Sequence, residues 1–346
     1  MTAASLNIRL LNTSARLLGA SPLPLRRRLA GRPRTVADQT LHPDVQRALK
    51  VLSDTETFET KPLDQGRAEL DAESAAFGTR PACAVVRDLA IPTRAGAILS
   101  RHYRRSASSE GRGTVLYFHG GGWVLGGLQS ADAVCRVIAR RTGLDVVQVD
   151  YRLAPEHPFP AAVEDAIDSF GWLRDQAEEF GGSPDRIAVA GESAGGNLAA
   201  VVAMETRNDR TGPAFACPIF PVTDLSSKAQ SYHDFSHGFF LTEAQMDWYR
   251  EHYLVDPSHA TDPRVSPLLA DDLSGQCPTC VVLAGVDPLR DEGRAYADRL
   301  SEFGVTTEVL QFDGFIHGFI NATAMGREVV GRVEQIADRI LTGLQH

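Results

Sequence analysis

A five-residue turn, Gly191-Glu-Ser193-Ala-Gly195, constrains the fold of this chain more than any other feature. The apolar run at 187–190 before it predicts a buried strand, and the small residues after it predict a helix. A serine on such a sharp strand-to-helix turn points its hydroxyl out of the sheet, and the flanking glycines let the backbone segments approach. Because Gly-x-Ser-x-Gly also occurs by chance, the rest of the chain decides its meaning.

Strand and helix patterns alternate on both sides of this turn. Strands are predicted at 85–91, 97–103, 114–118, 145–149, 187–190, 215–220, 279–284 and 306–312. Helices are predicted at 131–141, 161–180, 194–207, 291–303 and 327–344. This alternation predicts an α/β fold whose mainly parallel central sheet is covered by helices on both faces.

Two segments fall outside the alternation. Residues 40–80 have the pattern of helices with breaks, and an aromatic stretch at 222–265 interrupts the chain after a central strand. An apolar insertion in that position is typical of a lid over a site, although a surface excursion with its own small core is the alternative. We expect residues 1–83 and 222–265 to form a helical cap, and residues 84–221 and 266–346 to form the catalytic α/β domain.

Charge and hydropathy argue against some classes of partner. The 346-residue chain has a formal net charge of −9, which argues against nucleic acid as the main partner. No apolar run approaches the ~20 residues that cross a bilayer, so we expect no integral membrane segment. The sequence also lacks a secretory signal pattern, and we therefore expect a cytoplasmic protein.

The first 37 residues contain seven arginines and no acidic residue. A basic amphipathic start of this kind is typical of a transit peptide or of a membrane-surface helix. Helical spacing of the leucines favours instead a solvated cap helix whose leucines are turned inward. These leucines are Leu6, Leu10, Leu11, Leu17 and Leu18.

Cysteine and histidine patterns predict no metal and no cofactor. The five cysteines are scattered, which suits a reducing compartment. Cys277 and Cys280 have the spacing of a redox or zinc half-site, but β-branched residues follow and no second pair completes a zinc site. His233 and His237 have the spacing of a helical metal pair, but surface histidines on a helix are far commoner.

The run His119-Gly-Gly-Gly122-Trp123 follows the predicted strand at 114–118. Acyl transfer needs amide donors aimed at the oxyanion of a tetrahedral intermediate, and consecutive glycines let the backbone come close enough to supply them. A glycine run after a strand, well before a serine turn, is typical of one half of an oxyanion hole. The Ala194 amide is expected to supply the other half.

A serine hydroxyl becomes a nucleophile when a histidine takes its proton and an acid orients that histidine. In this architecture the acid and then the histidine follow the serine, each in a loop after a strand. Asp287 and His317 occupy these two places. Asp291 is a rival acid, but it resembles the cap of the next helix. We therefore predict Ser193, Asp287 and His317 as catalytic residues.

Five motifs in this order resemble the hormone-sensitive-lipase-like family of α/β-hydrolase carboxylesterases, over a region from about residue 84 to the C-terminus. They are His119-Gly-Gly-Gly122, Asp150-Tyr-Arg-Leu-Ala-Pro-Glu156-His-Pro-Phe-Pro-Ala161, Gly191-Glu-Ser-Ala-Gly-Gly196, Asp287-Pro-Leu-Arg-Asp-Glu-Gly293 and His317-Gly-Phe319. Leu41-His-Pro-Asp44 is similar to the start of the family's cap.

The resemblance implies an α/β-hydrolase fold in which Ser193 is the nucleophile, His317 the general base and acid, and Asp287 the orienting acid. It also implies that the amides of Gly121, Gly122 and Ala194 form the oxyanion hole. His119 is then a residue that holds its loop. Family members are often dimers through the edge of the last strand, which implies a homodimer.

One residue departs from the family pattern, because many relatives carry Asp where this chain has Glu192. The extra methylene puts fine specificity in doubt, but not the class of reaction. Other charged clusters are interpreted as structural. Glu164 and Asp165 are expected on a solvated helix face, and Asp150-Tyr-Arg152 with Glu156-His157 in a structural loop.

We expect a serine carboxylesterase that acts on small-molecule esters with short to medium acyl chains. An amidase or a lactonase with the same triad is an alternative. A non-catalytic ligand-binding member is another, since plant gibberellin receptors resemble this family but have an incomplete triad. Aromatic residues are expected to line an apolar acyl pocket. These are Trp123, Phe239, Phe240 and Trp248.

Overall fold

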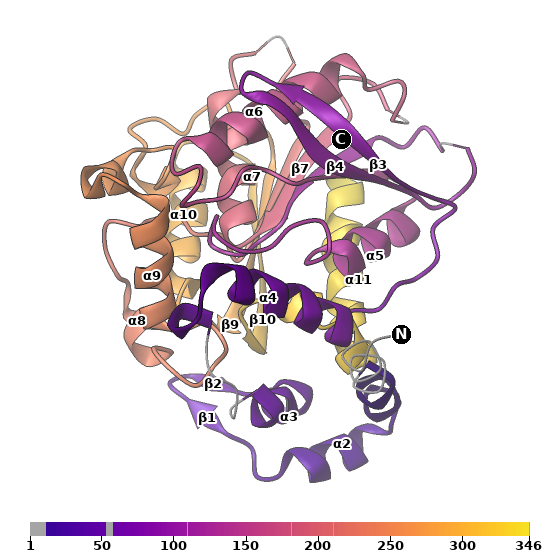
Figure 1. Cartoon of the computed structure of the whole chain (residues 1–346), viewed down its shortest axis with the longest axis vertical. Helices are drawn as coiled ribbons and strands as arrows, with labels where there is room; N and C mark the ends of the chain where they lie inside the picture. The colour runs from indigo at the N-terminus through magenta and orange to yellow at the C-terminus, as the bar shows by residue number, and fades with distance from the viewer. Residues whose placement is uncertain (1–11, 53–57, 109, 181, 210, 346) are drawn as a thin grey trace.

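An eight-stranded sheet forms the centre of the computed structural model, which describes residues 12–52, 58–108, 110–180, 182–209 and 211–345 (Figure 1). The strand order is β10-β9-β8-β7-β5-β6-β4-β3. All neighbours from β6 to β10 are parallel, whereas β4 joins β6, and β3 joins β4, antiparallel. The strands are β3 (Val85–Thr93), β4 (Gly96–Arg104), β5 (Thr114–Phe118), β6 (Asp145–Val149), β7 (Ile187–Glu192), β8 (Phe215–Ile219), β9 (Thr279–Val286) and β10 (Thr307–Ile316). The predicted mainly parallel sheet is confirmed.

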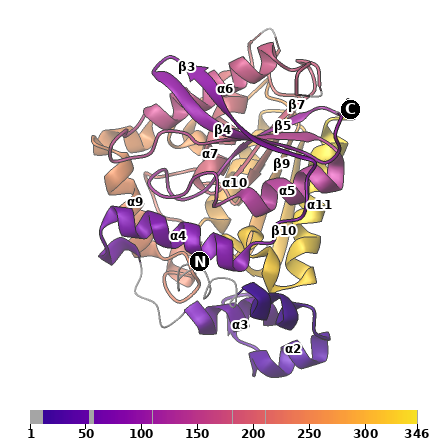
Figure 2. The same ribbon diagram turned by 45° about the vertical axis from the view of Figure 1, so that its right-hand side comes forward.

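Helices cover both faces of this sheet (Figures 1 and 2). Strands β5 to β9 are buried along their whole length, which explains their continuous apolar runs. Side chains alternate between the two faces, so Leu116 and Val115 of β5 belong to different core clusters. One face packs against α5 (Asp132–Thr142) and α11 (Arg327–Gly343). The other packs against α6 (Ala161–Asp175), α7 (Ala194–Glu205) and α10 (Arg290–Glu302).

Two predicted element ends differ from the structure by more than two residues. Helix α6 ends at Asp175 rather than at residue 180, because the chain continues in tight turns that bring Phe180 back into the core. Strand β10 continues to Ile316, beyond the predicted end at 312. Its register against β9 shifts between Phe312 and Ile316, so that the strand carries the chain directly to His317.

Most of the remaining helices come from the N-terminal region and from the insertion after β8. The N-terminal region contains α2 (Leu23–Ala30), the hairpin of β1 (Thr35–Val36) and β2 (Gln39–Thr40), α3 (Pro43–Leu52) and α4 (Leu63–Phe77). The insertion contains α8 (Gln230–Asp234) and α9 (Glu243–Tyr253). The hairpin contacts β10 near its end, where Gly314 donates its amide to Gln39 and accepts a hydrogen bond from the His42 amide. The assignment of these segments to a cap stays a prediction.

The prediction that the N-terminal leucines turn inward is wrong for Leu17 and Leu18, whose residues are 70% and 40% exposed. The helical residues 12–19 dock instead through a polar and small face. Asn12 donates to the carbonyls of Ala76 and Gly78, both at 2.9 Å, and Gly19 packs against backbone at 325–326. Residues 1–11, with the other three leucines, lie outside the described residues.

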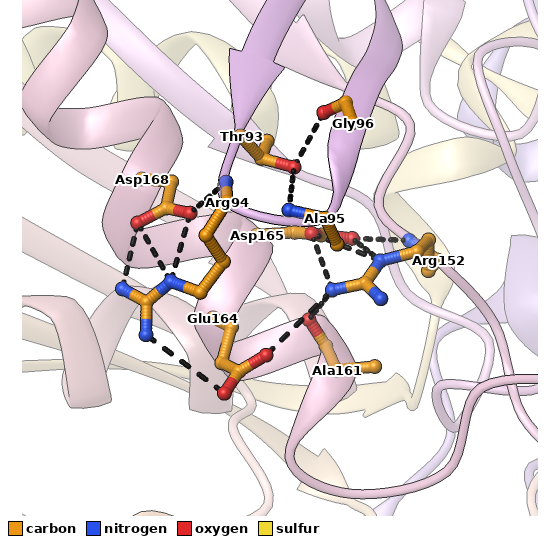
Figure 3. A network of polar contacts seen from close by, with 9 residues as sticks. All are labelled: Thr93, Arg94, Ala95, Gly96, Arg152, Ala161, Glu164, Asp165 and Asp168. Carbon is orange, nitrogen blue, oxygen red and sulfur yellow. Dashed lines mark hydrogen bonds and ion pairs between the residues drawn. The ribbon is translucent and has the colours of Figure 1, made fainter.

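The predicted solvated position of Asp165 is also wrong, because this carboxylate is fully buried. Figure 3 shows Asp165 on α6 facing Arg152, which reaches it from the loop after β6. The Arg152 guanidinium donates to both carboxylate oxygens at 2.8–3.0 Å, and the Arg152 backbone amide also donates to one of them at 2.9 Å. Arg94 pairs with Asp168 beside it, so the network ties the β3–β4 turn and the loop after β6 to one helix.

The described residues contain no cluster of three or more His, Cys, Asp or Glu placed to bind a metal. His233 lies in α8, but the helix ends at Asp234, so His237 is not on the same helix. Cys277 precedes β9 and Cys280 is buried in it, so this pair opens no helix. Across the part of the chain that the structure describes, no helix has the length and apolar character needed to span a membrane.

Candidate active site

Ser193 stands at the turn between β7 and α7 in a backbone conformation that few residues other than glycine adopt, with φ 58° and ψ −120°. The backbone fixes this conformation, because the Ser193 amide donates to Ile219 at 2.9 Å and its carbonyl accepts from Asn197 at 2.9 Å. Gly195 makes the turn possible, since a Cβ there would lie 2.1 Å from the carbonyl oxygen of Phe118. The hydroxyl is thereby held at the carboxyl end of the sheet.

The structure brings the three predicted catalytic side chains into one hydrogen-bond chain. Ser193 Oγ lies 2.9 Å from His317 Nε2, and His317 Nδ1 lies 2.7 Å from Asp287 Oδ2. Asp287 is fully buried, and its other oxygen accepts from the Leu289 amide at 2.9 Å. An acceptor at Nδ1 keeps the proton on that nitrogen and leaves Nε2 free to accept the serine proton.

The rival carboxylate, Asp291, is directed elsewhere. It lies in the first turn of α10 rather than at its cap, accepts from the Ser231 amide at 2.9 Å and pairs with Arg290. These contacts join α10 to α8. The geometry therefore favours Asp287 as the partner of His317.

The predicted oxyanion loop follows β5, beside Ser193. Gly121 and Gly122 both have positive φ, and neither amide donates to another protein group within the described residues. Ala194 begins α7, where the first amides of a helix have no acceptor within the helix. Gly122 is required by close approach, because a Cβ there would lie 2.1 Å from the ring of Tyr249. These three amides are the donors available beside the serine.

A stacked pair of rings supports this loop from behind. His119 is fully buried and stacks on Tyr151 with ring centroids 4.3 Å apart. Tyr151 donates its hydroxyl to the His119 carbonyl at 2.8 Å, and His119 Nδ1 lies 2.7 Å from the Gly120 carbonyl. Burial lowers the pKa of His119 to about 4, so this ring is neutral at pH 7 and donates from Nδ1. Because Arg152 follows Tyr151, the ion pair with Asp165 anchors the same support to α6.

Glu192, the residue that departs from the family pattern, is buried directly before the serine. Burial raises the pKa of its carboxyl group. Its Oε1 accepts from Asn321 Nδ2 at 3.4 Å, and Asn321 ends the short turn (Phe319–Asn321) that follows His317. Its side chain also packs beside Gly120 of the oxyanion loop. Glu192 therefore contacts both loops that flank Ser193.

The four predicted pocket residues occupy different environments. Trp123 is fully buried and stacks on Tyr253 of α9 at 4.2 Å. Phe239 is buried beneath the guanidinium of Arg34, 4.3 Å from the ring centroid. Trp248 is partly buried. Phe240 is 41% exposed, and its ring lies beside Gly318, the residue after His317. Their role in an acyl pocket stays a prediction.

Two neighbours of the triad were not singled out from the sequence. Tyr249 of α9 is buried against Gly122, one position from the predicted Trp248. Phe220 follows β8, and its ring lies 4.7 Å from that of His317 in an edge contact. The place of Phe220 at the carboxyl end of a central strand was a usable signal. Nothing in the sequence distinguishes the two adjacent aromatic residues of α9.

Glu292 of α10 is a buried carboxyl group that holds the segment after β8. Its Oε1 accepts from the amides of Thr223 and Asp224 at 2.7 and 3.3 Å. This segment passes the serine, because the Val222 amide donates to the Ser193 carbonyl at 3.4 Å. Burial raises the pKa of Glu292 to about 8.

Replacement of Glu292 by glutamine is expected to remove a pH-dependent loss of stability. Folding raises the pKa of the Glu292 carboxyl group from 4.5 to about 8. The protonated group therefore stabilises the folded protein fully below pH 4.5, and this stabilisation is lost as the pH rises from 4.5 to about 8. Between these values the wild type should lose up to about 1.4 kcal/mol of unfolding free energy per pH unit relative to Glu292→Gln. Urea unfolding at several pH values measures the difference. Glu302→Gln, at an exposed glutamate of the same helix, is the control. Parallel pH curves for wild type and Glu292→Gln would contradict the expectation.

Comparisons with known proteins show which family and which relatives this chain is similar to. Residues 115–321 match a family described as having the alpha/beta hydrolase fold. Over 332 residues the chain is 40% identical to the carboxylic ester hydrolase LipN of Mycobacterium tuberculosis, covering 91% of this chain and 86% of that protein. Over 265 residues it is 35% identical to the ethyl acetate hydrolase of Pseudomonas putida, covering 74% and 83%. The solved hyperthermophilic esterase from the archaeon Pyrobaculum calidifontis superposes with a TM-score of 0.83 at 38% identity, covering 87% of this chain and 98% of that chain.

Proposed function

We propose that this chain hydrolyses short- to medium-chain esters through an acyl-enzyme on Ser193. The chain belongs to the α/β-hydrolase family and is a carboxylic ester hydrolase of its hormone-sensitive-lipase-like branch. The observation that carries the proposal is the hydrogen-bond chain from Ser193 through His317 to Asp287, with contacts of 2.9 and 2.7 Å. Turnover of p-nitrophenyl butyrate tests it. Release no faster than that of Ser193→Ala would instead favour a ligand-binding function.

The mechanism begins with attack of Ser193 Oγ on the ester carbonyl while His317 Nε2 takes the hydroxyl proton. The amides of Gly121, Gly122 and Ala194 hold the resulting oxyanion, and their fixed orientation needs no rearrangement during the step. Collapse expels the alcohol, which receives the proton from His317. His317 then activates a water molecule that cleaves the acyl-enzyme, and the acid leaves with Ser193 restored. Asp287 keeps the imidazole oriented and stabilises its protonated form throughout.

The cap that we infer from residues 1–83 and 222–265 supplies the apolar surroundings of the acyl group. Contacts of both segments with the oxyanion loop support this role. Tyr249 packs on Gly122 from the insertion, and Arg67 of α4 donates to the Val124 carbonyl at 2.9 Å. Phe240 of the insertion is partly exposed and lies beside Gly318, which follows His317. Such a boundary of bulky side chains favours limited acyl length.

A series of p-nitrophenyl esters from acetate to palmitate is therefore expected to give the highest kcat/KM at short to medium chains. Each added methylene gains transfer free energy until the chain meets the aromatic boundary, after which longer chains gain nothing. Phe240→Ala should move the optimum to longer chains. Phe303→Ala is the control and should not move it, because Phe303 caps the C-terminal end of α10. An optimum above twelve carbons for the wild type would contradict the proposal.

We also propose a homodimer through the outer edge of β10. This strand ends the sheet, and within the described residues its outer edge at 307–312 pairs with no strand. Unpaired edges offer a row of backbone donors and acceptors to a second copy. Light scattering should give twice the 37.5 kDa mass of one chain, and a monomer at all concentrations would contradict this.

The predicted cytoplasmic location also stays a prediction, which fractionation of the source cells would test.

A further inference from the structure

The N-terminal region presents four exposed leucines that its contacts with the rest of the protein do not use. Leu17 and Leu18 are 70% and 40% exposed, and Leu25 and Leu29 of α2 are each 45% exposed. Leu25 and Leu29 are one helical turn apart and therefore lie on the same side of α2. Exposed leucines are common singly, but here four lie within thirteen residues of one another in the sequence, and concentrations of exposed apolar residues mark interaction sites.

The other side of α2 fixes the patch in place. Arg26 is buried in an ion pair with Asp44 of α3 and donates Nε to the Ser21 carbonyl at 3.1 Å. Gln46 of α3 donates to the Ala30 carbonyl at 2.9 Å. Polar contacts thus attach the helix to α3, and the leucines are left facing outward. The leucines are therefore exposed on a helix that is itself held in place by α3.

Arginines without acidic partners neighbour these leucines in the sequence. Arg27 and Arg28 are exposed, and within the described residues neither they nor Arg16 and Arg32 form an ion pair with a carboxylate. The chain has no acidic residue before Asp38, although its formal net charge is −9. We call the exposed residues Leu17, Leu18, Leu25, Leu29, Arg27 and Arg28 together the leucine–arginine face. On α2, Arg28 lies on the same side as Leu25 and Leu29, and Arg27 lies on the other exposed flank. The face is a positive and apolar region of an otherwise acidic protein.

We propose that the leucine–arginine face binds an anionic lipid surface. Such a surface offers phosphate groups to the guanidinium groups and acyl chains to the leucines, which matches the composition of an interfacial helix. A second copy of the chain fits less well, because a symmetric contact would bring arginines against arginines. A nucleic acid would satisfy the arginines but leave the leucines in water. Of these three partners, the anionic membrane is the one that matches both the charge and the apolar character of the face.

The position of the face gives this contact a consequence for the site. In Figure 1, α2 lies at the end of the molecule occupied by α3 and the β1–β2 hairpin. That end contacts β10 near its carboxyl terminus, where the His42 ring stacks on Phe315 with centroids 4.9 Å apart. His317 follows two residues later. Binding would therefore hold the candidate active site at the end of the protein that faces the lipid.

Sedimentation of the full chain with lipid vesicles tests the proposal. We expect binding to vesicles of phosphatidylcholine mixed with phosphatidylglycerol, little binding to phosphatidylcholine alone, and weakening as salt rises from about 0.05 to 0.5 M. Absence of binding to the anionic vesicles at low salt would overturn the proposal. Since the assay measures binding only, its failure is independent of whether the chain hydrolyses esters.

Two pairs of substitutions locate the contact. Leu25→Ser with Leu29→Ser should abolish most binding, and Arg27→Gln with Arg28→Gln should weaken it by about 25-fold, since each arginine near an anionic surface contributes about fivefold. Thermal melts would confirm that each variant is folded. Matched controls change the same kinds of residue elsewhere and should bind like the wild type. They are Val86→Ser with Leu99→Ser, and Arg112→Gln with Arg141→Gln.

Three results would assign the face differently. Equal loss in the controls and in the test variants would show binding by overall charge or hydropathy. A change from dimer to monomer in the leucine variant, without vesicle binding by the wild type, would make the face an interface between copies. Binding of the wild type to polyglutamate but not to anionic vesicles would indicate an acidic protein partner. Each of these results overturns the proposal.

Discussion

Replacement of His317 by alanine is expected to lower kcat for p-nitrophenyl butyrate by a factor on the order of 10⁶. The imidazole is the only basic group within hydrogen-bond distance of Ser193 Oγ in the described structure, so the variant has no acceptor for the hydroxyl proton. Substrate binding should change little, because the oxyanion amides and the apolar surroundings are retained. The loss should therefore appear in kcat rather than in KM, in single-turnover and steady-state assays.

Ser193 and His317 together offer a test that separates loss of proton transfer from general damage to the structure. Ser193→Ala should lose as much activity as His317→Ala, and the double variant should lose no more than either, because the two groups act in one step. His233→Ala, which removes an exposed histidine of α8, should retain full turnover. A His317→Ala enzyme within tenfold of the wild type would exclude the proposed proton transfer.

Substitution of Gly122 by alanine is expected to lower kcat by about 10²–10³, the loss seen when one oxyanion donor is removed. The new Cβ would lie 2.1 Å from the Tyr249 ring, and the residue would retain a strained φ of 60°. The loop must shift away from α9 to relieve the contact, which turns the Gly122 amide away from the serine. Stability should fall less than activity, since the loop lies at the end of the sheet.

A second substitution separates steric contact from backbone strain. Gly122→Ala combined with Tyr249→Ala should recover part of the lost kcat, because the truncated side chain makes room for the added methyl group. Gly304→Ala adds a methyl group at a similar φ of 79° where no atom lies within 4 Å, and it should leave kcat unchanged. If Gly122→Ala behaves like Gly304→Ala, the position of the Gly122 amide is unimportant for the reaction.

The convergence of the site was predictable because each of its parts follows a strand. Strands that are buried on both faces have continuous apolar runs, so the sequence predicts where they end. In a parallel sheet the carboxyl ends of such strands meet at one edge. Ser193 and Asp287 each follow a strand of this kind, whereas His317 follows β10, an edge strand that is only partly buried and whose end lies four residues beyond the predicted one. The structure joins the three residues by hydrogen bonds.

The errors at Asp165 and at Leu17 and Leu18 share one physical cause, because the sequence of a helix does not identify the segment that packs against it. The sequence places Asp165 on a solvated helix face, yet Arg152 reaches it from the loop after β6 and pairs with it in the core. Leu17 and Leu18 were assigned to the core because they recur at helical spacing, yet Asn12 and Gly19 make the contacts. The periodicity of a sequence shows which residues share a side of a helix, but the segment that packs against the helix determines which side is buried.

The sequence alone therefore determined the order of strands and helices, the turn that exposes Ser193 and the residues that end the strands beside it. Only the tertiary structure decided that Tyr249 closes on Gly122, that Glu192 contacts both flanking loops and that the N-terminal leucines face outward. The first group depends on backbone conformation and apolar period, which are properties of neighbouring residues. The second depends on contacts between segments far apart in the chain, which no local pattern encodes.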